Sequence, residues 1–347
     1  MRSAPLARRL PLAYAGATGV VALTMLVALV VGPVHIPVSG AMRDLVDHLP
    51  GVDLHSGLAQ SDQAILWQFR APRIVLGALV GGMLAVAGSA YQGAFRNPLA
   101  DPYLLGVAGG AGLGATLAIV ARTTVSHSIF SPVPLAAFAG ALGAVVITYL
   151  VGGAGRAATT TTLVLAGVAV SSFVTAVQTY IQQRNSDVLR EVYTWILGRL
   201  IAARWSDVGL VIPYVVVASG VIMAMRRTLD VLAVGDEEAT TLGIRVGRAR
   251  LIIVIAASLG TAAVVAVSGL IAFVGIIVPH GVRLVVGTSY RRIVPLSMLV
   301  GAAFLVATDL LARTVASPAE VPIGVITAFF GAPFFVLLLR GSRRARS

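Results

Sequence analysis

Long apolar stretches separated by short polar ones recur along the chain from residue 12 to residue 339. A helix needs about 20 apolar residues to cross the roughly 30 Å hydrocarbon core of a membrane, so these stretches predict membrane-spanning helices. The pattern predicts ten spans, at 12–32, 73–94, 103–121, 134–152, 161–182, 207–225, 251–271, 273–287, 294–313 and 322–340. The eighth is short and the third is rich in glycine, so neither is expected to be a simple rod.

One further apolar stretch, at 188–200, is too short to cross a membrane. Its apolar positions follow helical spacing at Val192, Trp195, Ile196 and Leu200. This pattern predicts a re-entrant or interfacial helix. The first span follows a short basic segment, as a signal peptide would. Its apolar run is about 20 residues, longer than a signal-peptide core, so we expect it to be retained.

The composition is that of a polytopic membrane protein. Hydrophobic residues make up 57% of the chain and charged residues 12%, with a mean hydropathy of +0.91. A soluble domain carries about 25% charged residues. No polar stretch is long enough for a separate soluble domain, so we expect a single transmembrane domain over residues 1–347. The fold class predicted is therefore an all-α polytopic membrane protein.

Two residue types are missing from the chain, cysteine and lysine. Without cysteine there is neither a disulfide nor a thiolate metal site. A phosphate-binding loop of the Walker type needs a lysine. If ATP drives this protein, another subunit must therefore bind the ATP. We predict no catalytic residue, no cofactor and no metal site.

The net charge of +12 comes from arginines that cluster in the loops between apolar spans. Such clustering is typical of cytoplasmic loops and does not indicate nucleic-acid binding. With both termini in the cytoplasm, that side holds 17 arginines and five acids, and the other side holds nine of each. We therefore predict cytoplasmic termini and, with the partners named below, a bacterial inner (plasma) membrane location.

A repeated spacing hints at internal symmetry. Gly88, Pro98 and Gly106 are ten and eight residues apart, as are Gly269, Pro279 and Gly287. The two sets lie on spans predicted to run in opposite directions, which indicates an inverted-topology repeat with helix pairs near 73–121 and 251–287. The alternative is coincidence in a chain with 37 glycines and 16 prolines.

The segment 226–250 is the longest predicted cytoplasmic loop, and it is not a plain linker. Three acids, Asp236, Glu237 and Glu238, suit the first turn of a short helix, and Gly243 suits its end. We predict two short helices lying on the cytoplasmic face. The apolar residues of this segment require a partner surface.

The sequence "LDVLAVGDEEATTLGI" within this segment resembles the coupling segment of permease subunits of ABC importers for iron–siderophore, haem and vitamin B12. Further motifs follow in the family's order. They are "FRAPRIVLGALVGGMLAVAGSAYQGAFRNPLADPYLLGVAGGAGLG", "LVLAGVAV", "GLIAFVGIIVPHGVRLVVG" and "AEVPIGVITAFFGAPFFVLLL". The resemblance covers nearly all of the chain beyond residue 65. It implies the type II ABC importer permease fold, with ten helices per subunit.

The same resemblance implies partners and site residues. The partners are a second permease subunit, most simply a homodimer, two ATPase subunits and an external substrate-binding protein. Residues implied in ATPase coupling are Gly235, Asp236, Glu237, Ala239 and Gly243. Residues implied in the inner gate are Asn97, Leu99, Thr160 and Thr161, although the threonines also suit helix capping. Residues implied in docking of the binding protein are Arg70, Arg73 and Arg313, although interfacial arginines also snorkel.

Several other polar residues carry weaker signals. The outer-loop residues His35, His48, His55, Asp44, Asp47 and Asp53 fit no standard metal cluster and are expected to be solvated. His280 could face the path or bind iron or haem, but the family also has Pro-His here, which favours a structural role. Asp309 could relay protons, but a partner for Arg313, four residues on, is the simpler expectation.

The predicted function is ATP-driven inward transport of a metal chelate by alternating access, without covalent chemistry in this chain. Ferric siderophore is favoured as the commonest family substrate, with vitamin B12 and haem as alternatives. A secondary transporter driven by an ion gradient would place acids within its spans, and here the spans hold almost none. An intramembrane enzyme would need a catalytic or metal constellation, which the sequence lacks.

Overall fold

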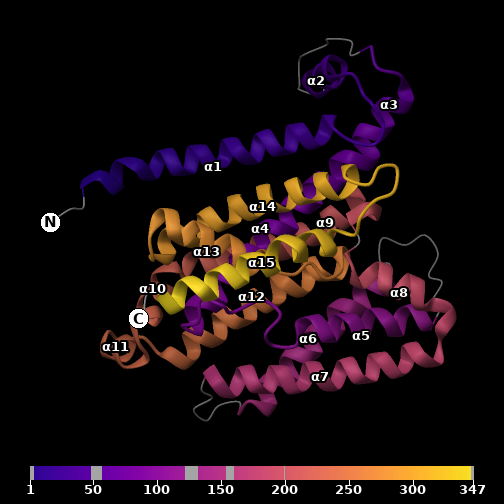
Figure 1. The fold of residues 1–347 in the computed structure, drawn as a ribbon. Helices are drawn as coiled ribbons and strands as arrows, with labels where there is room; N and C mark the ends of the chain where they lie inside the picture. The colour runs from indigo at the N-terminus through magenta and orange to yellow at the C-terminus, as the bar shows by residue number, and fades with distance from the viewer. Residues whose placement is uncertain (1–3, 48–56, 122–131, 154–159, 199, 345–347) are drawn as a thin grey trace.

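The computed structural model describes residues 4–47, 57–121, 132–153, 160–198 and 200–344, and within these ranges it contains helices and connections but no strand. Seven helical segments are long and apolar enough to cross a membrane, and three shorter apolar helices accompany them. The long ones are α1 (Ala4–Val30), α4 (Ala71–Ala94), α6 (Pro132–Val151), α7 (Thr160–Arg184), α9 (Trp205–Ala224), α12 (Val246–Ser268) and α14 (Tyr290–Thr314). The shorter ones are α5 (Val107–Val120), α13 (Val274–Val286) and the stretch Ile323–Val336 of α15 (Ile323–Arg344). Each predicted span coincides with one of these helices (Figure 1).

The short helices lie at the two ends of the bundle. They are α2 (Val38–Asp47), α3 (Gln60–Ala64), η1 (Ile65–Arg70), η2 (Ser186–Val188), α8 (Leu189–Ile196), η3 (Leu200–Ala202), α10 (Arg226–Val234) and α11 (Asp236–Thr241). The predicted helix at 188–200 is therefore present, and its Val192 and Trp195 are buried. The second span was expected to begin at residue 73. It begins earlier, because α3 and the π-helical turn η1 continue into α4 from Gln60 to Ala94.

Helix α4 is the buried centre of the bundle, and α9, α12, α13 and α14 pack around it. Lipid tails are as apolar as leucine, so helices in a membrane associate through close packing of small residues. A Cβ on Gly81 would lie 2.2 Å from the carbonyl oxygen of Gly301, and one on Gly88 would lie 2.0 Å from that of Gly275. These glycines let α14 and α13 approach the α4 backbone.

The glycine-rich helix α5 packs in the same way against α6. A Cβ on Gly110 would lie 2.2 Å from the carbonyl oxygen of Gly140, and one on Gly114 would lie 2.0 Å from that of Ala136. Side chains at these positions would push the two helices apart. The glycines of the third predicted span therefore allow α5 and α6 to pack closely.

The repeated Gly–Pro–Gly spacing does not mark equivalent positions. Gly88 lies inside α4, whereas Gly269 follows the end of α12 with a φ of 70°. Pro98 lies in the turn after α4, whereas Pro279 lies inside α13. The local structure differs at these matched positions, so the spacing itself is no marker of a repeat.

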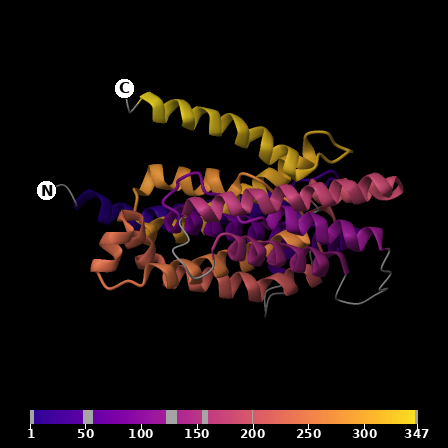
Figure 2. The ribbon, with the colours of Figure 1, turned by 90° about the horizontal axis from the view of Figure 1, so that it is seen from below.

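One end of the bundle carries the beginning of α1, the end of α15, and the short helices α10 and α11 (Figure 1). We call this the inner end and the opposite one the outer end. Helix α1 is peripheral, since only 11% of the residues in the apolar stretch of its described part are buried. Helix α15 diverges from the bundle toward its C-terminus (Figure 2).

Candidate functional site

At the outer end, Arg73 of α4 is the centre of a buried ionic cluster. Its Nε and Nη2 donate to Asp309 Oδ1 of α14 at 2.9 and 2.8 Å, and its Nη1 donates to Glu320 Oε1 at 3.0 Å. Two-pronged, charge-assisted hydrogen bonds of this kind are among the strongest in proteins. The cluster ties α4 and α14 to the segment that leads into α15. Asp309 therefore has Arg73 as its close partner, whereas Arg313 Nε lies 3.8 Å from it.

The other two predicted docking arginines hold the C-terminal end of α1. Arg70 Nη1 donates to the carbonyl oxygens of Leu29 and Val30 at 2.8 and 2.7 Å, and Arg313 donates to that of Ala28. The last carbonyls of a helix lack partners within it and carry partial negative charge, so they suit arginine. The structure thus brings the predicted docking residues together, but it buries them.

We call Arg70, Arg73 and Arg313 the outer arginine cluster. A carboxylate from another protein would have to displace Asp309, Glu320 or the α1 carbonyls to bind there. Docking at these residues stays a prediction. A cleft of about 270 Å³ opens beside the cluster, between α8 and the segment before α15, and it is lined in part by the exposed Arg190 and by Glu320.

At the inner end, the coupling segment (226–250) contains the two predicted short helices, α10 and α11. Gly243 ends α11 with a φ of 80°, in the left-handed region that favours glycine. The Gly243 N–H donates to Thr240 O at 2.9 Å and the Ile244 N–H donates to Ala239 O at 3.0 Å. This is the Schellman pattern of a glycine-capped helix end. The glycine cap predicted from sequence is confirmed.

The coupling segment has one face on the bundle and one face outward. Leu229 and Leu232 of α10 and Ala239 of α11 are fully buried. Val234 and Leu242 are each 70% exposed, beside the exposed acids of α11. Two large apolar side chains on a helical surface that the chain itself leaves uncovered indicate a protein interface. The segment therefore has the surface expected of a docking element.

Arg250 of α12 joins the coupling segment to the end of α4. Its Nη2 donates to both carboxylate oxygens of Asp236 at 2.9 and 3.1 Å, and its Nε donates to Ala94 O at 2.9 Å. Ala94 is the last residue of α4. Sequence reasoning missed Arg250, because spacing along the chain does not reveal a contact with a residue 156 positions away.

The predicted gate residues Asn97 and Leu99 lie in the irregular stretch 95–106 between α4 and α5. Asn97 Oδ1 accepts from the Leu99 N–H at 2.9 Å, and Asp101 Oδ1 accepts from the Tyr103 N–H at 2.8 Å. The third span was expected from residue 103, but α5 begins at Val107. The Tyr103 hydroxyl reaches Ile271 O at 3.0 Å, so the stretch folds back into the bundle. Such backbone is tolerated there because its polar groups are bonded within the protein.

The second pair of predicted gate residues, Thr160 and Thr161, begins α7. Thr160 is half-buried and Thr161 is exposed. Within the described part of the chain, no hydrogen bond links this pair to Asn97 or Leu99. The gate therefore stays a prediction.

The weaker candidates divide between the described residues and the rest. His48, Asp53 and His55 lie outside the described residues, and the remainder of the described chain holds no cluster suited to a metal. Asp44 was expected to be solvated. It is buried, because it accepts hydrogen bonds from the side chains of Gln63 and Trp67 at 3.1 and 2.6 Å.

His280 on α13 packs edge-on against the ring of Phe334 on α15, with ring centroids 5.8 Å apart. This contact joins two of the shorter apolar helices and accords with the structural role expected for His280.

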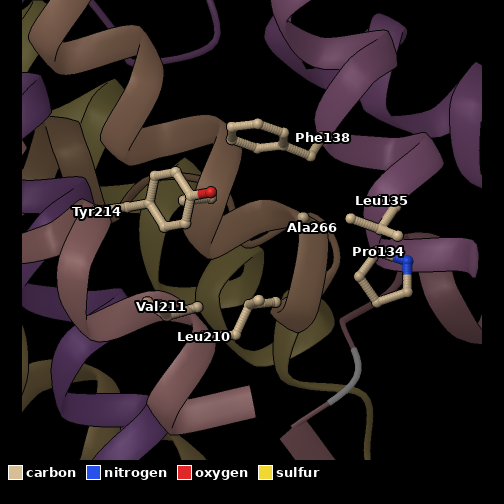
Figure 3. Close-up of a pocket in the computed structure, with 8 residues that line it drawn as sticks. Pro134, Leu135, Phe138, Leu210, Val211, Tyr214 and Ala266 are labelled. Carbon is tan, nitrogen blue, oxygen red and sulfur yellow. The ribbon is translucent and has the colours of Figure 1, made fainter. Parts of the chain in front are cut away.

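A small apolar crevice lies between α6, α9 and α12, where Phe138 faces Tyr214 with ring centroids 5.4 Å apart (Figure 3). Its volume is about 30 Å³. It is too small to hold a metal chelate, so a transport path must be sought elsewhere.

The comparisons with known proteins decide the family. The family model of the FecCD transport family matches residues 20–341. The chain belongs to the FecCD transport family. This FecCD permease is 45% identical to the cobalamin import system permease protein BtuC of Halobacterium salinarum over 83% of this chain and 76% of the relative. It is 37% identical to the Fe(3+) dicitrate transport system permease protein FecD of Escherichia coli over 79% of this chain and 85% of the relative.

A solved structure supports the same assignment. An inward-facing conformation of a metal-chelate type ABC transporter matches this FecCD permease with a TM-score of 0.82 and 27% identity, over 95% of this chain and 99% of that one. The predicted fold class and family are confirmed. The chain is a multi-pass membrane permease of an ABC importer and is not itself an enzyme.

Proposed function

We propose that this chain moves a metal chelate from an external binding protein into the cytoplasm by alternating access, driven by a separate ATPase subunit. The observation that carries the proposal is the outward face of the coupling segment. Val234 and Leu242 offer apolar surface there, and Asp236 and Glu237 offer charge. An ATPase subunit would dock on this face, with Gly235, Ala239 and Gly243 setting the shape of α11.

Arg250 would carry the ATPase movement to the gate. It holds Asp236 of α11 and Ala94 of α4 at once, and the stretch with Asn97 and Leu99 begins directly after α4. A displacement of α11 would therefore act on the inner end of α4. Thr160 and Thr161 would form the other part of the gate.

The transport path would lie between two copies of the chain. Among the described residues, neither the cleft beside the outer arginine cluster nor the apolar crevice between α6, α9 and α12 forms a path through a single copy. Helices α7 and α15 carry large exposed apolar side chains, with Phe173 at 70% and Phe329 at 72% exposure. A second copy facing these helices would complete the path and cover part of this surface.

In this arrangement the inner end faces the cytoplasm and holds both termini, in a bacterial inner (plasma) membrane. The excess of arginines in the loops of that end supports this orientation. The binding protein would then dock at the outer end, where Arg70, Arg73 and Arg313 lie.

Three chelates are candidates for the substrate. Ferric siderophore is the first candidate, because ferric chelates are the commonest cargo of the family the sequence resembles. Cobalamin is the second, because the cobalamin permease of Halobacterium salinarum is 45% identical to this chain. Haem stays as a further alternative.

The test is uptake into vesicles that contain this permease with its ATPase, supplied with its binding protein. Radiolabelled ferric siderophore, cobalamin and haem would be offered in parallel, with ATP or with an ion gradient alone. We expect uptake of one chelate class that requires both ATP and the binding protein. Uptake driven by the ion gradient without ATP would overturn the proposal in favour of a secondary transporter.

A further inference from the structure

A polar cleft opens at the inner end, where α14 begins against α1 and α10. Its volume is about 310 Å³. The lining residues are Leu10, Tyr14, Arg226, Ser289, Arg291 and Arg292. The cleft is separate from the outward face of the coupling segment, which α11 and the end of α10 provide.

Three arginines converge on this cleft without a counterion. Within the described part of the chain, Arg226, Arg291 and Arg292 form no ion pair. Arg292 donates to the carbonyl oxygen of Val286, at 3.3 Å. This differs from the outer arginine cluster, in which every guanidinium group is bonded within the chain. Three uncompensated positive charges around one cleft favour an anionic ligand.

Asp230 of α10 is an acid bonded to the cleft lining. Its carboxylate accepts from the Ser289 hydroxyl at 2.9 Å and from the Tyr290 N–H at the first residue of α14. The N-terminal end of the 25-residue helix α14 adds partial positive charge at the same place.

The surroundings of the cleft indicate where the anion comes from. Helix α1 forms one wall and is peripheral, and its Leu12 is 71% exposed. The cleft thus opens at the end of a spanning helix whose apolar side chains face outward. Headgroups and acyl chains of a bilayer meet at this depth, and basic pockets between spanning helices on the cytoplasmic side bind anionic headgroups.

We propose that this cleft binds the phosphate group of an anionic phospholipid, with the acyl chains lying along the exposed side of α1. Guanidinium groups match phosphate oxygens with paired hydrogen bonds, so Arg226, Arg291 and Arg292 would hold the headgroup. The bound lipid would join α1, α10 and α14 at the inner end. Its binding does not depend on the transported substrate or on coupling to the ATPase.

The test uses the purified full chain in vesicles of phosphatidylcholine that contain phosphatidylglycerol. After solubilisation, native mass spectrometry would count the lipids retained by each chain. We expect retention of phosphatidylglycerol in preference to phosphatidylcholine. In R226Q/R291Q/R292Q the affinity for phosphatidylglycerol should fall on the order of a hundredfold. The single variant R291Q, at an exposed position, should lose about fivefold and serves if the triple variant does not fold.

Arg227 provides a matched control, because it is exposed on the same turn of α10 and does not line the cleft. R227Q should retain phosphatidylglycerol as the parent does. Equal retention by the parent and by both cleft variants would overturn the proposal, and so would an equal loss in R227Q. Inorganic phosphate serves as a competitor. If millimolar phosphate displaces the lipid strongly from the parent but not from R291Q, the cleft binds free phosphate and the lipid proposal is wrong.

Discussion

The outer arginine cluster and the coupling segment are both implied as docking sites by the family resemblance, but the structure gives them opposite characters. At the outer end, Arg73 is buried with Asp309 and Glu320 around it. At the inner end, Val234 and Leu242 are uncovered beside exposed acids. In the first region each arginine is bonded to groups of its own chain, and in the second region apolar side chains are left uncovered.

This difference shows that a charged motif and a docking surface are separate properties. A buried charge requires partners, so the outer cluster contributes to folding whether or not a binding protein arrives. An exposed apolar side chain on a short helix contributes little to the fold of its own chain. Substitutions should therefore separate the regions, with losses of stability at the outer end and losses of coupling at the inner end.

The largest loss of stability is expected for R73A. It would leave the buried Asp309 and the half-buried Glu320 without the arginine that bonds both, and breaking a buried pair costs about 3–5 kcal/mol. Thermal unfolding of the purified protein in detergent would measure this. R190A is the control, because Arg190 is exposed beside the same cleft and its loss should stay within about 0.5 kcal/mol. If R73A had normal stability but lost affinity for the binding protein, Arg73 would serve docking rather than folding.

A smaller loss is expected for G243A. An alanine in the left-handed conformation of Gly243 costs about 1–2 kcal/mol. The end of α11 should shift, and ATP hydrolysis should continue without uptake in reconstituted vesicles. G247A is the matched control, since Gly247 lies in the first turn of α12 with open space around it. Intact coupling in G243A would remove this glycine from the coupling mechanism.

R250Q should change stability still less, because the Asp236 side of the pair is exposed and such a pair contributes about 1 kcal/mol or less. Uptake should nevertheless fall severalfold while ATP hydrolysis persists, since the link between α11 and Ala94 is broken. D236N should lower uptake as R250Q does, and uptake by the double variant should be no lower than by either single variant. R248Q, at an exposed position on the same helix, is the control. Equal uptake by R250Q and R248Q would refute the link.

The smallest effect on stability is expected for T161W, because Thr161 is exposed. If Thr160 and Thr161 border the inner gate, a bulky side chain there should block uptake while expression and thermal unfolding stay unchanged. T179W, at an exposed position near the other end of α7, is the control and should transport normally. Normal uptake by T161W would exclude this part of the gate.

Much of the fold could be predicted from sequence, because the membrane makes the apolar pattern decisive. Helix α7, expected at 161–182, runs from Thr160 to Arg184, and α13, expected at 273–287, runs from Val274 to Val286. The exceptions have local causes. A π-helical turn carries α4 back to Gln60, and polar side chains hold the stretch 95–106 in an irregular path.

The candidate site was predictable where it is local in sequence. The glycine cap at Gly243 and the two helices of the coupling segment follow from backbone preferences over a few residues. The partners of Arg73 and Arg250 did not follow. Asp309 lies 236 positions from Arg73, and Ala94 lies 156 positions from Arg250. Neither periodicity nor charge pattern encodes such distances.

The sequence by itself determined the spans, the two short helices within 226–250 and the membership of the family, since helix formation in a membrane depends on runs of neighbouring residues. Only the tertiary structure decided which arginines are free. Arg73 is enclosed by two carboxylates, whereas Arg226, Arg291 and Arg292 line an open cleft and form no ion pair among the described residues. The physical reason is that an arginine is paired or unpaired according to the side chains that the packing of distant helices places beside it.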